Sequence, residues 1–203
     1  MEAISKNKLL PQNFLIGIFL CILYILDSLY DAIIRCNGEK INFEHHKILF
    51  LLNSILVLFV LLFERRYLKN FSAHKTIKWL DCCIILPLLL CFVIILSHYI
   101  SLNKVIIAFT PLILLIAYWF CWIMLGNSVR SVKDDFIGLL KELGILNIIA
   151  TLSIPISFAS VFNHSIILTI LSYAVNIPPL VTLIIIYRRA IAFTKTMDTI
   201  KPE

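Results

Sequence analysis

The sequence predicts an all-α membrane protein, a bundle of about six transmembrane helices that forms a single domain over residues 1–203. First, 61% of the residues are hydrophobic and only 15% are charged, and a soluble protein of this size cannot bury so much apolar surface. Second, apolar runs near the ~20 residues that cross a bilayer recur along the chain. Third, lysines and arginines collect in alternate loops, as they do in polytopic membrane proteins.

The apolar runs define six predicted spans. They cover residues 14–34, 48–63, 79–100, 105–126, 143–162 and 166–187. The first run follows Lys6 and Lys8, but it is too long for a cleaved signal peptide, which predicts a retained signal anchor. The second run is short, and the fifth carries Asn147 and several hydroxyl side chains, so a four-span arrangement is the alternative.

The distribution of basic residues predicts the orientation in the membrane. Of the 18 lysines and arginines, the six-span arrangement leaves only Arg35, Lys40, Lys47 and Lys104 on the outer side. Because basic residues collect on the cytoplasmic side, both termini are predicted to be cytoplasmic, in a bacterial-type inner (plasma) membrane. The same topology explains the net charge of +6, which therefore does not indicate direct binding of nucleic acid.

Residues 128–142 are predicted to form a cytoplasmic amphipathic helix that runs into the fifth span. Asn127 and Ser128 supply side chains that can cap its start. Such a helix would lie on the membrane surface, dock a soluble partner, or extend the fifth span into water. Its apolar residues recur at helical spacing: Val129, Val132, Phe136, Leu139 and Leu143.

The most informative polar feature inside a predicted span is a pair of carboxylates, Asp27 and Asp31, one helical turn apart. A carboxylate is costly near the centre of a bilayer unless it is paired or hydrated, so this helix face is a candidate site for handling protons or cations. No intramembrane lysine or arginine is evident as a partner. The alternative is that both side chains lie near the outer surface and bond to neighbouring spans. Asn53 and Asn176 complete the candidate site.

Prolines predict kinks in four of the predicted spans. Pro178 and Pro179 follow Asn176 in the sixth span, and Pro87, Pro111 and Pro155 lie in the third, fourth and fifth. Proline removes a backbone donor and kinks a helix, and two in succession free carbonyl groups that can coordinate ions or form a hinge. Broken helices mark the binding site in several transporter folds, and they also serve as ordinary packing devices.

Histidines and cysteines supply possible metal ligands and thiols, but their spacing along the sequence does not match a known metal-binding pattern. His45, His46, His98 and His164 map to the outer face, but no pair has the spacing that places two ligands on one helix face. Of six cysteines, only Cys36 lies in a polar loop, so a disulfide framework is not expected. The sequence therefore predicts no metal site and no cofactor.

His74 and Cys82 place a base and a thiol about two helical turns apart, with Asp81 between them. In size, six-span layout and the order His74, Trp79, Cys82, the chain distantly resembles the membrane endopeptidases that process Agr-type signalling peptides. The resemblance implies a cysteine endopeptidase that uses His74 and Cys82. The chain departs from that family because residues 69–73 lack the glycine-containing approach to the histidine and the spacing differs by one residue.

The leading interpretation is a non-enzymatic membrane subunit that self-associates as a homo-oligomer. It would anchor, sense or perturb the lipid bilayer together with a soluble cytoplasmic partner. In size and layout the chain looks like membrane components of bacterial immunity and phage-defence systems, such as that of Kiwa. The alternatives are a small proton- or cation-coupled transporter or channel that uses Asp27 and Asp31, and the endopeptidase. The residues predicted to contact the partner are Arg65, Arg66, Lys69, Arg130, Lys133, Phe136, Arg188 and Arg189.

Overall fold

The computed structural model of the chain describes residues 11–36, 43–69, 73–99, 104–132, 139–163 and 165–199. Within these ranges the chain forms eight helices, and the all-α prediction is confirmed. Their bounds are α1 (Pro11–Cys36), α2 (Phe43–Leu68), α3 (His74–Tyr99), α4 (Lys104–Arg130), α5 (Leu140–Ala150), α6 (Ser153–Asn163), α7 (Ile166–Ala174) and α8 (Ile177–Thr199).

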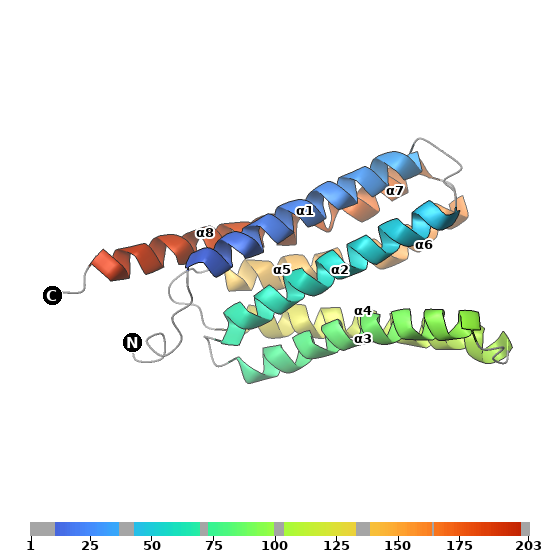
Figure 1. The fold of residues 1–203 in the computed structure, drawn as a ribbon, viewed down its shortest axis with the longest axis horizontal. Coiled ribbons are helices and arrows are strands. Elements are labelled where there is room, and N and C mark those ends of the chain that lie inside the picture. The colour runs from blue at the N-terminus through green and yellow to red at the C-terminus, as the bar shows by residue number, and fades with distance from the viewer. Residues whose placement is uncertain are drawn as a thin grey trace.

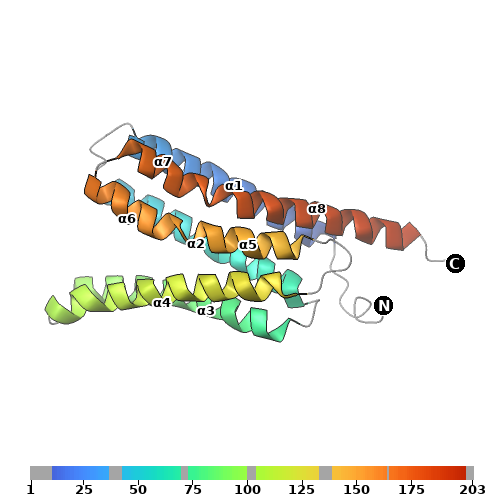
Figure 2. The ribbon, with the colours of Figure 1, turned by 180° about the vertical axis from the view of Figure 1, so that it is seen from behind.

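The helices form two layers. In one layer α1, α2 and α3 lie side by side (Figure 1), and the other layer consists of α4, of α5 followed by α6, and of α7 followed by α8 (Figure 2). The layers meet where α1 packs against α7 and α8 and where α3 packs against α4, while α4 and α5 pack within the second layer. This arrangement places α2 opposite α5 and α6 in the middle of the bundle.

Five segments are long and apolar enough to cross a membrane: Phe14–Cys36, His74–Val93, Leu112–Arg130, Leu140–Ser157 and Ile166–Phe193. Their outward faces carry large apolar side chains, such as Phe19, Phe92 and Ile167, which are exposed on the bundle surface. An apolar surface of this extent is stable against lipid and not against water. The chain is therefore an integral membrane protein that crosses the bilayer several times.

α2 and the fifth predicted span bear on the number of crossings. α2 matches α1 in length at 26 residues, but it carries Glu64, Arg65 and Arg66 near its end, and it is not among the five segments. The fifth predicted span, despite Asn147 and its hydroxyl side chains, does have the length and composition of a spanning helix. The four-span alternative would leave at least one of the five long apolar segments outside the membrane.

The fifth predicted span is broken between α5 and α6, at Thr151 and Leu152. Pro155 lacks the amide proton that would bond the Thr151 carbonyl oxygen in a continuous helix. That oxygen instead accepts a hydrogen bond from Nε1 of Trp119 on α4, at 3.1 Å. The interruption is thus stabilised by a side chain of the neighbouring helix.

The sixth predicted span is broken between α7 and α8, at Val175 and Asn176. Pro178 and Pro179 lack the amide protons that would bond the carbonyl oxygens of Ala174 and Val175. The Asn176 side chain donates a hydrogen bond of 3.0 Å back to a carbonyl oxygen of α7. The structure thus has a break at the proline pair and a second one in the preceding span, whereas Pro87 and Pro111 lie within α3 and α4 and do not interrupt them.

The amphipathic helix predicted over residues 128–142 is not one helix. α4 ends and α5 begins within this range, and residues 131–132 form a turn between them. Residues 133–138, and with them Lys133 and Phe136, lie outside the described residues. The prediction of a continuous helix is therefore wrong at the turn.

Hydroxyl side chains explain the turn after α4. Ser131 Oγ donates a hydrogen bond of 2.7 Å to the Ser128 carbonyl oxygen, which competes with continued helical bonding. Ser128 itself does not cap a helix, because it is buried inside α4 and shares a 2.8 Å hydrogen bond with the Thr76 hydroxyl of α3. The chain then reverses, and α5 packs against α4.

α4 and α5 approach each other at two glycines, Gly126 and Gly144. A Cβ atom on Gly144 would lie 2.5 Å from the Arg130 amide nitrogen and 2.5 Å from the Gly126 carbonyl oxygen. Small residues permit such close backbone contact between membrane helices. The pair therefore sets the distance between the two helices.

Candidate functional site

A cavity of about 170 Å³ lies between the two layers, where α2 faces the broken helices. Leucine, valine, isoleucine, alanine and proline side chains form much of its wall. The polar and aromatic side chains that line it are Tyr24, Glu64, Tyr118, Trp122, Asn147, Thr151, Ser153 and Asn176. These residues come from α1, α2, α4, α5 and the two interruptions, so most of the helices in the bundle contribute to the cavity wall.

Glu64 and Asn147 are the buried polar groups of this cavity. Each side chain is only 4% exposed. Glu64 Oε1 and Asn147 Nδ2 have no hydrogen-bond partner within the described part of the chain. Burial of an unbonded polar group is costly, and more so for a carboxylate, so an occupant that bonds to both atoms would stabilise the folded protein.

Aromatic rings form another part of the wall. Tyr118 and Trp122 lie one turn apart on α4, with ring centroids 6.1 Å apart and planes at 85°. Tyr24 of α1 contributes the third ring. Ring faces attract cations through their quadrupole, and this attraction adds to the charge of Glu64.

Both helix interruptions meet at the cavity. Thr151 and Ser153 line it from the break between α5 and α6, and Asn176 and Pro179 line it from the break between α7 and α8. Freed backbone groups and helix ends at the same point are typical of binding sites in membrane transport proteins. The geometry therefore resembles a binding site more than two unrelated kinks.

Asp27 and Asn53, predicted as site residues, contact each other across α1 and α2. Asn53 Nδ2 donates to Asp27 Oδ2 at 3.1 Å. The pair lies one helical turn from Tyr24 and Val57, which line the cavity. It therefore continues the polar region of the cavity away from Glu64.

Asp31 contacts two partners one turn further along α1. The Tyr173 hydroxyl of α7 donates to Asp31, and Arg35 donates to it from 3.1 Å. The sequence analysis identified no basic partner for this carboxylate, and Arg35 is that partner. Asn176, the last predicted site residue, lies in the cavity itself.

His74 and Cys82, the alternative catalytic pair, lie on the same helix but apart. Eight positions along α3 separate them by about 12 Å at 1.5 Å per residue. His74 is exposed, while Cys82 packs against the buried core. Asp81 forms an ion pair with Arg65 of α2, which includes a 3.1 Å bond from Nη2. The described residues therefore do not assemble a thiol and a base.

The predicted outer histidines cannot be placed. The side chains of His45, His46 and His98, and the whole of His164, lie outside the described residues. Among the described residues, no group of three or more histidine, cysteine or acidic side chains has a metal-binding arrangement.

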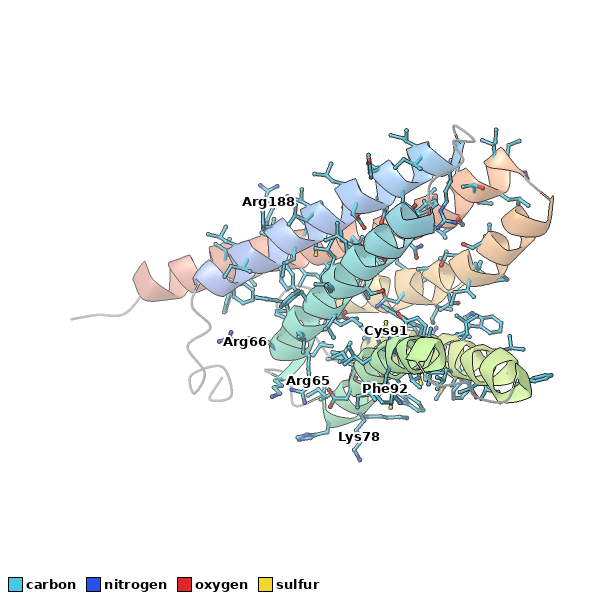
Figure 3. All side chains as sticks on the ribbon, turned by 45° about the vertical axis from the view of Figure 1, so that its right-hand side comes forward. Arg65, Arg66, Lys78, Cys91, Phe92 and Arg188 are labelled. Carbon is cyan, nitrogen blue, oxygen red and sulfur yellow. The ribbon has the colours of Figure 1, made fainter. Side chains whose placement is uncertain are left out.

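The predicted partner-binding residues that the structure describes gather at one end of the bundle, where α1 begins. Figure 3 shows Arg65, Arg66 and Arg188 toward this end, together with Lys78 of α3. Arg65 bonds to Asp81 as described above. The other described members of the set are exposed: Arg66, Lys69, Arg130, Arg188 and Arg189.

Glu64 is the charged residue of the cavity wall, and it was not among the site residues predicted from the sequence. It stands directly before Arg65 and Arg66, and three charged residues in a row are typical of a helix end in water. A signal was nevertheless present, because Val57, Leu61 and Glu64 recur at helical spacing on one face of α2. That face is the one that lines the cavity.

Comparisons of the chain with protein-family models, with curated proteins and with solved structures find no match. Its function is therefore argued from the geometry of the bundle and its cavity.

Proposed function

We propose that this chain is a non-enzymatic carrier with six membrane spans that moves a cation across the bilayer. One observation supports this above the others: two broken helices meet at an internal cavity that contains the buried carboxylate of Glu64. Buried acids within membrane segments bind protons or cations in many transport proteins, and broken helices supply the polar backbone at such sites.

Three carboxylates trace a route along the bundle in this proposal. Glu64 lies in the cavity near the end where the basic residues gather. Asp27 lies beyond the cavity on α1, and Asp31 follows one turn later. A cation that leaves Glu64 would therefore meet further carboxylates before it reaches the opposite surface.

The proposed orientation follows from the basic residues. With α2 counted as a span in addition to the five segments, the chain crosses the membrane six times. α1 then enters the membrane and α8 leaves it at the same surface. Exposed basic side chains of α2, α3, α4, α5 and α8 lie at that surface, and basic residues favour the cytoplasmic side. Both termini are then cytoplasmic.

Neutralising Asp27 tests the carrier. In proteoliposomes with an imposed gradient of protons, sodium, potassium or choline, we expect the wild-type protein to move at least one of these cations. Asp27→Asn should lower that flux at least about tenfold, the factor that corresponds to ~1.4 kcal/mol in a barrier, because it removes a charge from the route. The amide retains the shape of the carboxylate and can still accept from Asn53.

The matched control is Glu142→Gln, which removes an exposed carboxylate of α5. Flux, oligomer mass and thermal stability should stay at the wild-type value in this variant. Absence of flux in the wild-type protein for every cation tested, or equal flux in Asp27→Asn, would refute the carrier.

A second candidate function is a self-associating membrane subunit that holds a soluble cytoplasmic protein. It is favoured by the exposed basic side chains at one end of the bundle, which would attract an acidic partner. Arg188→Gln combined with Lys69→Gln should then release a soluble protein that co-purifies from native membranes. Purification of the wild-type chain without any soluble protein would exclude this candidate.

A further inference from the structure

We infer that the cavity binds a compact organic ammonium ion that also carries a hydroxyl or carbonyl oxygen. This inference names the cargo class of the proposed carrier and rests on that function. It draws on four features of the cavity: its charge, its aromatic walls, a second buried polar atom, which belongs to α5, and its volume.

Glu64 supplies the charge. Its side chain is 4% exposed, and Oε1 has no hydrogen-bond partner among the described residues. In the part of the cavity wall that the structure describes, no lysine, arginine or histidine balances it. A buried carboxylate without a counterion favours a cationic occupant.

The aromatic rings favour an organic cation over a metal ion. Calcium and magnesium require six or more oxygen ligands, whereas the aromatic side chains of Tyr24, Tyr118 and Trp122 form a large part of this wall. Aromatic rings at right angles, like those of Tyr118 and Trp122, form the walls of sites that bind quaternary ammonium groups. An ammonium ion would lie between these rings and Glu64.

Asn147 supplies the second polar contact. Its Nδ2 is a buried donor without a partner in the described part of the chain. A cation alone would satisfy Glu64 and leave this donor unbonded. An occupant with an acceptor oxygen, such as a hydroxyl or a carbonyl group, would satisfy both residues.

The volume limits the occupant to a small molecule. A cavity of roughly 150 Å³ accepts benzene, and this one measures about 170 Å³. An ammonium alcohol such as choline falls within this range. The same chemistry occurs as the headgroup of a phospholipid, so the test must distinguish a free ion from a headgroup.

The experiment measures choline binding by titration calorimetry to the full chain in nanodiscs of phosphatidylglycerol, which has no ammonium headgroup. We expect saturable binding that weakens at least about tenfold in Glu64→Gln and returns in Glu64→Asp. The exposed Glu142→Gln should bind like the wild-type protein. The uncharged isostere of choline, in which carbon replaces the ammonium nitrogen, should bind at least about tenfold more weakly.

Asn147→Leu separates the two ends of the site. It should weaken choline binding but leave tetramethylammonium binding unchanged, because tetramethylammonium has no oxygen to accept from Nδ2. This readout remains informative if one Glu64 variant fails to fold. Competition by phosphatidylcholine added to the nanodiscs would identify the headgroup as the occupant, and its absence would identify the free ion.

Two results would overturn the inference: equal choline binding by the wild-type protein and Glu64→Gln, or equal binding of choline and its uncharged isostere. The outcome is separable from that of the carrier. Choline binding without flux of any cation would refute the carrier and retain the site. Flux of an inorganic cation without choline binding would retain the carrier and refute this cargo.

Discussion

Gly144→Leu is expected to abolish accumulation of the folded protein. A Cβ atom at this position would lie 2.5 Å from two backbone atoms of α4, the Arg130 amide nitrogen and the Gly126 carbonyl oxygen. Because neither obstacle is a side chain that can rotate away, α4 and α5 would have to separate. Overpacking usually costs ~1–3 kcal/mol, and a forced separation of two helices exceeds this range. Yield in membranes and the size-exclusion profile in detergent measure the effect.

Two further variants make this test specific. Gly144→Ala introduces the Cβ atom alone and should give an intermediate yield. Ala174→Leu adds a similar bulk at an exposed position of α7 and should elute like the wild-type protein. A wild-type profile for Gly144→Leu would show that the two helices are not held at this distance.

The helices themselves could be predicted from the sequence, because their signal is local. Each apolar run except the short second one contains enough residues to cross a bilayer, and charged residues interrupt the runs at the loops. Pro155, Pro178 and Pro179 lie at the breaks of the fifth and sixth spans, but the sequence alone does not distinguish them from Pro87 and Pro111, which lie within the continuous helices α3 and α4. What the sequence could not predict is that both breaks line the same cavity.

The features that define the site depend on contacts between distant parts of the chain. In the sequence Glu64 looks like a loop residue, because Arg65 and Arg66 follow it. Only the packing of α2 against the second layer buries its side chain. Gly126 and Gly144 are likewise ordinary helix residues until α5 folds back against α4. The turn at residues 131–132, at which the predicted amphipathic helix is wrong, has a local cause instead, the hydrogen bond from Ser131 to the Ser128 carbonyl oxygen.

Straightening the sixth span should abolish transport without unfolding the protein. The double variant Pro178→Ala with Pro179→Ala restores two amide donors to the carbonyl oxygens of Ala174 and Val175. Alanine is favoured over proline by about 3 kcal/mol in a helix interior, so a continuous helix should replace the break. Asn176 and residue 179 would then leave their positions in the cavity wall, and we expect cation flux to fall at least about tenfold.

Pro87→Ala is the matched control, because Pro87 lies inside α3 and away from the cavity wall. It should leave flux and choline binding unchanged. The thermal midpoint then separates the two interpretations of the proline pair. If the break serves only as a packing device, the double variant should lower the midpoint and retain flux in the molecules that stay folded. If the break builds the binding site, flux and choline binding should be lost together. The thermal midpoint should then stay the same or rise, because folding no longer has to accommodate an interrupted helix around a polar cavity.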